Sequence, residues 1–516
     1  MPSNKAAHLC GFLFVLLLLA VPSLATNPLG FAKSPLFKNA KKYPSGSVQP
    51  TSIAVADVNM DGKPDVIIVS IHDCCDAGVV GIMLGNGDGT FQPVQNYDAG
   101  GQLPTSVTAA DLNGDGKIDL IVTHDEVPGN VSVLLGNGDG TFQPAQSFYS
   151  GGAEALSAAV GDINGDGKLD LVVDNVDDGQ GGITSIVGVL VGNGDGTFQP
   201  VQTYSTGRFY GGGPTSNTIA LADLSHDGKL DILEIMYCVR ALGCDAGGFL
   251  GVLMGNGDGT FQPLQLYNTG GLYPTSIAIG DVNGDGTLDV VAEDYLLLGN
   301  GDGTFQPGRA IGGGGMVALA DINRDGHLDV LNGYDCTAES RNGCAHFYQP
   351  LFSMLGNGDG TFYDGDDFDS GGNSANWLAV ADVNGDGKPD LLVANECLTL
   401  RDCSSGVVGV LLNDVLFPTT TSLSSAPNPS VEGQAVTFSV TVTPSSSFMP
   451  TGKVTIKNGR KTLASVRLSD GTGTLTRKNL PVGSLSITAT YDGDTNLAKS
   501  TSPVVIQVVN PSGARH

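Results

Sequence analysis

The chain has 516 residues, a net charge of −28, and aromatic residues at only 6% of its positions. A chain this acidic repels phosphate groups, so its charge argues against nucleic acid as a partner. The charge is unevenly distributed, because the part from Pro418 onward has nine Lys or Arg and four Asp or Glu. A basic C-terminal part therefore follows a strongly acidic one, and the length allows more than one domain.

The first 25 residues have the pattern of a secretory signal peptide. Lys5 precedes an apolar run over residues 9–21, and the small residues at 23–25 predict cleavage before Thr26. No later stretch is apolar for long enough to span a bilayer. We therefore expect a protein that is secreted or held at the cell surface, without a transmembrane segment and as a monomer.

Eight cysteines remain after the predicted cleavage, and they form four local pairs. The even number and the short spacings favour disulfides in an oxidising compartment, although spacing alone leaves reduced, buried thiols as the alternative. A bond between the two adjacent cysteines would be strained. The predicted pairs are Cys74 with Cys75, Cys238 with Cys244, Cys336 with Cys344, and Cys397 with Cys403.

A nine-residue pattern, Asp-x-Asn-x-Asp-Gly-x-x-Asp, occurs seven times along the chain, with Ser225 in place of Asn in the fourth copy. The first copy offers side-chain oxygens at positions 1, 3, 5 and 9, from Asp57, Asn59, Asp61 and Asp65. Oxygens at alternate positions of a short, Gly-bent loop are typical of calcium sites, and turns without a metal would not explain the alternation. We predict about seven Ca²⁺ sites, the other candidate ligands being Asp111, Asn113, Asp115, Asp119, Asp162, Asn164, Asp166, Asp170, Asp223, Ser225, Asp227, Asp231, Asp281, Asn283, Asp285, Asp289, Asp321, Asn323, Asp325, Asp329, Asp382, Asn384, Asp386 and Asp390.

The residues around each copy predict short strands. In one repeat, runs rich in Val, Ile and Leu cover residues 106–110, 118–123 and 131–135, and they are too short for helices. A second motif, Gly-Asn-Gly-Asp-Gly-Thr-Phe, occurs six times and contains hairpin-turn dipeptides. The Phe-Gln-Pro segments at its end are expected to begin a fourth, outer strand.

Four antiparallel strands repeated seven times predict an all-β fold, a seven-bladed β-propeller with calcium loops over residues 26–417. The seventh repeat ends near Leu412 without the second motif, so it lacks a fourth strand. The segment Leu36–Tyr43 precedes the first repeat and can supply that strand. Ring closure by the two ends would remove exposed sheet edges.

Together, the two motifs resemble FG-GAP or VCBS repeats, which are related to the N-terminal propeller of integrin α subunits. The resemblance implies the propeller fold and calcium ligands at positions 1, 3, 5 and 9 of every copy. It implies little about activity, because such proteins include adhesion modules and lectin-like binders as well as some lyases and dehydratases that act on sugars.

The tail beyond Phe417 has a different composition, rich in Ser and Thr and free of cysteine. Alternating apolar and polar residues over 436–442, 453–457 and 485–491 predict strands. The segment 489–500 resembles the end of a bacterial Ig-like repeat domain, a kind of domain that acts as a spacer or binding accessory. We expect a linker over residues 418–429 and an immunoglobulin-like β-sandwich over 430–510.

The strand order places the seven nonapeptide loops on one face of the propeller and the variable loops on the other. Trp377, the only tryptophan, is expected at the mouth of the central channel, where it would either stack on a sugar or cap the core. Disulfides in the variable loops would either hold a binding surface in one shape or protect the chain from proteolysis. Further ligand candidates on this face are Tyr210, Tyr273, Tyr295, Tyr334, His72 and His124.

The leading hypothesis is an exported, calcium-stabilised module that binds a glycan or an extracellular protein. A polysaccharide lyase or a sugar dehydratase on the same scaffold is the first alternative, and a purely structural surface module is the second. The sequence contains no motif of a nucleophile with a base. His-Asp neighbours occur at residues 72–73 and 124–125, but adjacent residues on a strand point to opposite sides, so we interpret both pairs as incidental. We therefore favour binding over catalysis.

Overall fold

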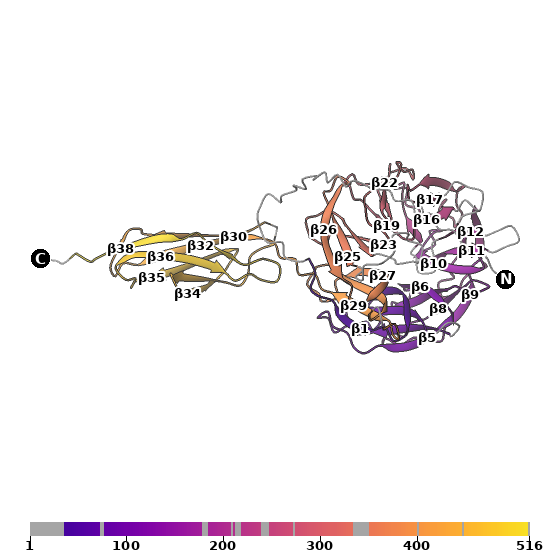
Figure 1. Ribbon diagram of the computed structural model, residues 1–516, viewed down its shortest axis with the longest axis horizontal. Helices are drawn as coiled ribbons and strands as arrows, with labels where there is room; N and C mark the ends of the chain where they lie inside the picture. Colours follow the sequence, from indigo (N-terminus) through magenta and orange to yellow (C-terminus); the bar gives the residue numbers. More distant parts are fainter. Residues whose placement is uncertain are drawn as a thin grey trace, which may run out of the picture. The chain divides into compact units, whose positions relative to one another are not determined.

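The computed structural model describes residues 36–72, 77–177, 184–207, 210–211, 218–238, 247–271, 274–333, 350–399, 402–445 and 448–513. The regular elements within these ranges are all β-strands (Figure 1). In the described part of the chain, no helix is long and apolar enough to cross a membrane. The predicted signal peptide lies outside it.

The repeats fold into antiparallel sheets, here called blades, of which the described residues form seven. The first three consist of β2 (Gln49–Ala56), β3 (Asp65–Ile71), β4 (Ala77–Met83) and β5 (Gln95–Gln102); β6 (Pro104–Ala110), β7 (Asp119–His124), β8 (Asn130–Leu134) and β9 (Gln146–Tyr149); and β10 (Glu154–Gly161), β11 (Asp170–Asp177), β12 (Thr184–Leu190) and β13 (Gln202–Gly207). The fourth consists of β15 (Ile219–Ala222), β16 (Asp231–Cys238), β17 (Gly247–Leu253) and β18 (Gln265–Asn268), with β14 (Tyr210–Gly211) also paired to β16.

The last three blades continue the same order. They consist of β19 (Ile277–Gly280), β20 (Asp289–Ala292), β21 (Tyr295–Leu297) and β22 (Arg309–Ala310); β23 (Met316–Ala320), β24 (Asp329–Gly333), β25 (Pro350–Gly356) and β26 (Phe362–Asp369); and β27 (Asn373–Ala381), β28 (Asp390–Cys397), β29 (Val407–Leu411) and β1 (Lys41–Pro44).

The two ends of the repeat region close the ring in the last blade. Strand β1 pairs with β29, and Phe37 forms a further bridge to Asn413. The inner strand β2 contacts both β6 and β27, so the first blade adjoins the second and the last. The expectation that the N-terminal segment completes the seventh repeat is confirmed, and this pairing removes two sheet edges.

The core lies between adjacent blades. Strand β7 is buried along its whole length, because both faces of its blade pack against neighbours. The phenylalanine of the second motif packs edge-on against an aromatic ring on the outer strand of the preceding blade, with ring centroids 5.1–5.7 Å apart. These pairs are Tyr43 with Phe91, Tyr97 with Phe142, Phe148 with Phe198, Tyr204 with Phe261, and Tyr267 with Phe305.

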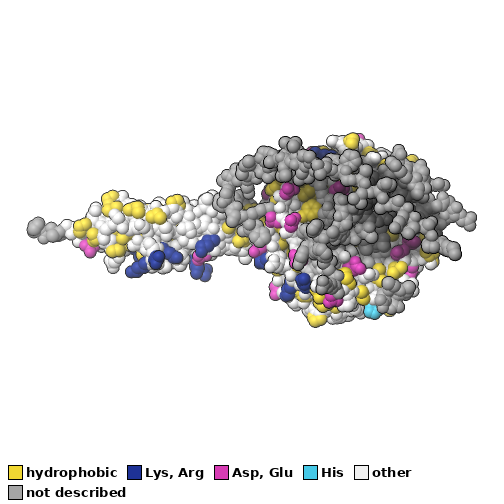
Figure 2. All heavy atoms as spheres, viewed as in Figure 1, with side chains coloured by type: hydrophobic (Ala, Val, Ile, Leu, Met, Phe, Trp, Pro, Cys, Tyr) yellow, Lys and Arg dark blue, Asp and Glu magenta, His cyan; other side chains and the backbone are white. Residues whose placement is uncertain are grey.

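The C-terminal domain is a sandwich of two sheets around Phe438, Ile487 and Tyr491. Lys and Arg side chains gather on one side of this domain (Figure 2), as its basic composition predicts. One sheet contains β30 (Thr419–Ala426), β32 (Val436–Pro444) and β35 (Thr472–Arg477), and the other β31 (Ser430–Val431), β38 (Val505–Asn510), β36 (Gly483–Tyr491), β33 (Lys453–Asn458), β34 (Lys461–Arg467) and β37 (Ser500–Thr501).

The predicted linker over 418–429 was wrong for most of its length. Strand β30 occupies residues 419–426 and pairs with β32 along all of them. Thr421 and Leu423 point inward from β30, while Ser422 between them is exposed. The Ser/Thr-rich segment has the alternation of a half-buried strand, and it forms the first strand of the sandwich.

Candidate functional site

The nonapeptide loops follow the inner strand of each blade and fold back on themselves. In the first loop, Asp57 Oδ2 accepts the Gly62 N–H at 2.7 Å, and Asp57 Oδ1 accepts the Asp61 N–H at 3.1 Å. Asn59 Oδ1 also accepts the Asp61 N–H, at 2.9 Å. The oxygens at positions 1 and 3 thus converge on the same turn of backbone.

Positive φ angles make these bends possible. Gly62, at position 6, has φ +80° and faces open space, and a glycine occupies this position in all seven copies. Position 4 also has a positive φ and is glycine in four copies, but it is Met60, His226 and Arg324 in the other three. A non-glycine residue in this conformation costs free energy, which contacts of its side chain would have to offset.

The aspartate at position 9 joins the two sequence motifs in the six repeats that contain both. Asp65 is fully buried, its Oδ2 accepts the Val58 N–H at 3.0 Å, and its Oδ1 accepts the Gly85 N–H at 2.7 Å. Gly85 begins the second motif, so one carboxylate fixes the loop to the hairpin between the third and fourth strands. The same pair of hydrogen bonds recurs in all seven blades, made by Asp65, Asp119, Asp170, Asp231, Asp289, Asp329 and Asp390.

These buried carboxylates lie in an electronegative setting. Burial raises the pKa of every position-9 carboxyl, to about 7 for Asp329 and Asp390, and the charge of the position-5 aspartate adds to the rise. In five copies a lysine at position 7 places its Nζ 2.9–3.7 Å from the position-5 carboxylate. Four of these five pairs are exposed to solvent and neutralise little charge.

The donors of each loop fit a hard cation, because all of them are oxygens. Within the described ranges, no three His, Cys, Asp or Glu side chains come close enough together to form a metal site by themselves. A Ca²⁺ ion takes six to eight oxygens, so the Asn or Ser at position 3 and backbone carbonyls would have to complete the set of Asp oxygens. The position-9 carboxylates are buried, whereas the side chains at positions 1, 3 and 5 are half-buried or exposed, which makes the loop side chains the better placed ligands.

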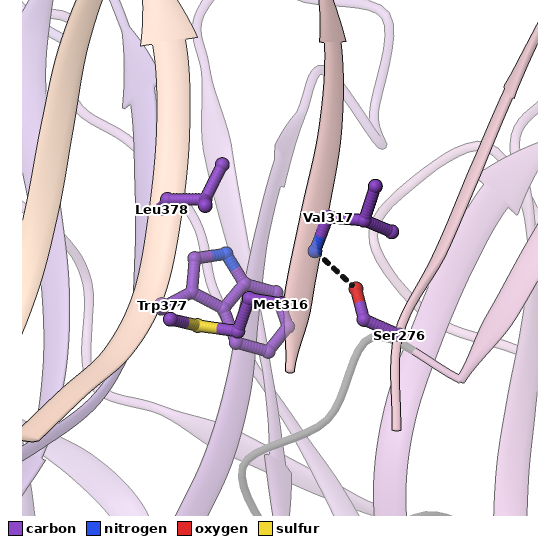
Figure 3. A pocket seen from close by; sticks show the side chains of 5 residues that line it. All are labelled: Ser276, Met316, Val317, Trp377 and Leu378. Carbon is purple, nitrogen blue, oxygen red and sulfur yellow. Dashed lines mark hydrogen bonds between the residues drawn. The ribbon is translucent and has the colours of Figure 1, made fainter. Parts of the chain in front are cut away.

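A small pocket lies away from the loops, at the start of three successive inner strands. Ser276, just before β19, Met316 on β23 and Trp377 on β27 line it, together with Val317 and Leu378 (Figure 3). The first three occupy the same position in consecutive repeats. The pocket is therefore part of the wall that the inner strands form around the centre of the propeller.

The structure gives this repeat position a role in joining blades. Ser276 Oγ accepts the Val317 N–H at 3.2 Å (Figure 3), and Ser52 Oγ accepts the Val107 N–H at 3.3 Å. Trp377 instead packs its half-buried indole against the cores on both sides of the seventh blade. Trp377 thus supports the core and also lines the pocket. Both predicted roles, capping the core and stacking on a sugar, are compatible with this position.

Family comparisons agree with the two motifs. The FG-GAP-like repeat model matches residues 57–122, 111–173, 177–234, 239–292 and 347–393, which together cover more than half of the chain. The chain is an FG-GAP-like repeat protein. A bacterial Ig-like domain of group 3 matches residues 423–510, and FG-GAP-like repeats are typical of extracellular β-propeller modules.

Other comparisons add little to this identification. No curated protein matches the chain in sequence. Among solved structures, the extracellular domain of a one-component system from B. thetaiotaomicron matches 93% of this chain and 59% of its own, with 10% identity and a TM-score of 0.39. This FG-GAP-like repeat protein thus spans less than two thirds of that chain.

The remaining ligand candidates of this FG-GAP-like repeat protein are scattered. His72 is exposed after β3, with its Nδ1 3.4 Å from Ser47 Oγ. Tyr295, on β21, packs its ring against the backbone of Gly270 and Gly271 in the preceding blade, and it does not line the pocket. The side chain of Tyr210, and Tyr273 and Tyr334 entirely, lie outside the described residues.

His124 does not reach the surface, contrary to its assignment as a ligand-binding residue. It is fully buried on β7, with Nε2 2.9 Å from Ser132 Oγ and Nδ1 3.1 Å from the Gln102 carbonyl oxygen. Burial lowers the pKa of this histidine, so it is held in its neutral form. The prediction failed because strand residues near the end of a blade are enclosed by the neighbouring blade.

One of the four predicted disulfides lies in described residues, and it is formed. Cys397, at the end of β28, is bonded to Cys403, which closes the loop between β28 and β29. The bridge between Thr399 and Asp402 lies inside this loop. The pairs Cys74 with Cys75, Cys238 with Cys244, and Cys336 with Cys344 include residues outside the described part of the FG-GAP-like repeat protein.

A buried acid pair between the third and fourth blades was missed from the sequence. Asp174 on β11 and Glu234 on β16 are fully buried and lie within hydrogen-bonding reach of each other. Ser185 Oγ contacts both carboxyl groups, and Thr218 Oγ1 donates to Asp174 Oδ2 at 2.5 Å. Burial raises the pKa of both acids, and none of the strands β10–β18 contains Lys, Arg or His to offset their charge.

Proposed function

We propose that this FG-GAP-like repeat protein is an exported, calcium-stabilised binding module that presents the face opposite its nonapeptide loops to a glycan or an extracellular protein. The observation that carries the proposal is the separation of two roles within each blade. The loops and their position-9 aspartates are the same in every repeat, while the opposite ends of the strands differ. A constant scaffold with a variable face is the arrangement expected of a binding module.

Calcium would act on the constant side. The acids at positions 1 and 5 lie near a buried position-9 carboxyl whose pKa is raised by burial, so added positive charge there would relieve repulsion. The ligands would be the oxygens at positions 1, 3 and 5, with position 9 holding the loop in shape. Binding of the ion to the folded state alone would stabilise that state.

The ligand would bind on the variable side. Trp377 offers the indole face best suited to stacking on a sugar ring, and its pocket is flanked by the inner strands of the fifth and sixth blades. The disulfide between Cys397 and Cys403 constrains the loop that follows the neighbouring strand β28, which lowers the cost of ordering a binding surface. His72 lies exposed in the first blade, whereas buried His124 is not available to a ligand.

A glycan array tests this proposal directly. The mature chain, with Trp377→Ala and Trp377→Phe variants, would be screened in calcium and again with a chelator. We expect binding to one sugar class that Trp377→Ala abolishes and Trp377→Phe largely retains, because Phe keeps an aromatic face. A blank array from folded protein would reject the glycan ligand, and a pull-down with extracellular proteins would then test the protein partner.

A further inference from the structure

Arg324 carries an unusual set of contacts outside its own loop. It occupies position 4 of the sixth nonapeptide, and its guanidinium lies 4.3 Å from the ring centroid of Phe448 and 5.5 Å from that of Phe417. Its Nη1 also donates to Asn496 Oδ1 at 3.0 Å. These three partners belong to the Ig-like domain or lead into its first strand, and their rings satisfy the geometry of cation–π contacts.

Arg324 makes these contacts from a backbone conformation that disfavours any side chain. Its φ is +61°, and the same position is glycine in four of the seven copies. Glycine would adopt this conformation without cost, whereas arginine does not. Met60 has the same φ of 61° at this position in the first copy, yet its side chain is 59% exposed.

A second contact comes from the neighbouring loop. Lys388, at position 7 of the seventh nonapeptide, donates from Nζ to the Thr495 carbonyl oxygen at 3.0 Å. Its side chain is 3% exposed, whereas the equivalent Lys63 is 43% exposed. Lys388 Nζ also lies 3.6 Å from Asp386 Oδ2, so the same ammonium group faces both the loop and the Ig-like domain.

The Ig-like segment that receives these contacts is held in a fixed turn. Asp494 Oδ1 accepts the N–H groups of Asn496 and Leu497, at 3.0 and 2.9 Å. Its Oδ2 accepts the hydroxyl of the buried Tyr491 at 2.8 Å. Asn496 and Thr495 are therefore presented by a preformed turn, which lowers the ordering cost of the contact.

We infer that Arg324 and Lys388 form a latch that holds the Ig-like domain against the sixth and seventh nonapeptide loops, and that cation binding in these loops tightens it. Arg324 lies between Asn323 and Asp325, so an ion bound at positions 3 and 5 would fix the backbone that directs the arginine. An ion bound by Asp386 would compete with Lys388 for that carboxylate, which would leave the Thr495 carbonyl as the main partner of the ammonium group. The coupling to the ion rests on the proposed calcium binding, but the latch itself does not.

The rate of acetylation of Lys388 in the full chain reports whether the Ig-like domain covers this side chain. In calcium, we expect Lys388 to react at least tenfold more slowly than Lys63, because only Lys388 is covered. Arg324→Gly should raise the Lys388 rate at least fivefold, since glycine suits the loop but cannot stack on Phe448. Met60→Gly is the matched control, because it replaces an exposed side chain by glycine at the same loop position, and it should leave Lys388 protected.

Three outcomes separate the parts of the inference. If Lys388 reacts as fast as Lys63 in the intact chain, or if Arg324→Gly leaves its rate unchanged, the latch is wrong. If Arg324→Gly exposes Lys388 but a chelator does not, the latch stands and its coupling to calcium is rejected. Asn496→Ala provides a second test from the Ig-like side, with a smaller rise expected, should Arg324→Gly fail to give folded protein by its melting curve.

Discussion

Asp65 and Gly85, twenty residues apart, are joined by a 2.7 Å hydrogen bond from the Gly85 N–H to the Asp65 carboxylate. This bond links the end of the nonapeptide loop to the start of the second motif, and its equivalent closes every blade. The two motifs that recur in the sequence are therefore two halves of one structural unit. The position-9 aspartate belongs to the fold as well as to any metal site.

Removing a position-9 carboxylate should destabilise the propeller even without calcium. Asp119→Ala leaves the buried N–H groups of Leu112 and Gly136 without acceptors, and we expect a loss of about 2–4 kcal/mol in the free energy of unfolding. Chemical denaturation in the presence of a chelator measures this loss. Asp139→Ala, which removes an exposed turn acid, should cost about 1 kcal/mol or less. Equal losses for the two variants would contradict the structural role of Asp119.

Calcium should raise the melting temperature, because it is expected to bind the folded loops alone. At a free concentration 100 times its dissociation constant, each independent site contributes about 2.7 kcal/mol. Asp115→Ala, which removes an acid at position 5, should reduce the calcium-dependent rise, while Asp258→Ala in an exposed turn should not. Melting curves with and without a chelator measure both effects. An unchanged curve for the wild-type chain would reject the calcium assignment.

The two described histidines that were ligand candidates should behave differently. His124→Ala removes a buried ring with two hydrogen-bonding contacts, so we expect a loss of about 2–4 kcal/mol in stability. His72→Ala changes an exposed side chain and should alter stability by about 0.5 kcal/mol or less. Denaturation curves measure both losses. Full stability of His124→Ala together with loss of turnover on a polysaccharide would instead support the lyase alternative.

Local patterns in the sequence were sufficient to predict the strands of the propeller, the position of its loops and the pairing of the chain ends, but not the first strand of the sandwich. The alternate oxygens of Asp57, Asn59 and Asp61 are fixed within one loop, so their geometry follows from spacing alone. Contacts between blades were not predictable in this way. The burial of His124 and the meeting of Asp174 with Glu234 depend on how neighbouring sheets pack, which no local pattern records. One available signal was overlooked, because Asp174 directly follows the apolar residues 171–173 and Glu234 lies between Leu233 and Ile235.

The buried pair of Asp174 and Glu234 should make stability depend on pH. Burial raises the pKa of Asp174 from 3.8 to about 6 in the folded protein, and that of Glu234 rises well above its usual value. Between pH 4 and 6 the folded chain therefore holds protons that the unfolded chain has released, so stability falls as the pH rises through this window. The loss attributable to Asp174 is on the order of 2–3 kcal/mol. The raised pKa of Glu234, caused by burial and by the charge of Asp174, changes stability in the same direction.

Unfolding free energies measured from pH 4 to 8 in a chelator test this dependence. Asp174→Asn keeps the shape of the side chain without its charge, so the fall in stability should become shallower by the share of Asp174, while the raised pKa values of the position-9 carboxyls keep the rest of the slope. Asp98→Asn removes an exposed acid on β5 and should leave the slope of the wild-type chain. If stability instead rises from pH 4 to 6 and Asp174→Asn does not change it, then Asp174 is ionised in the folded state. A cationic group would then have to offset its charge, and that group would have to come from outside the strands β10–β18, which contain no Lys, Arg or His.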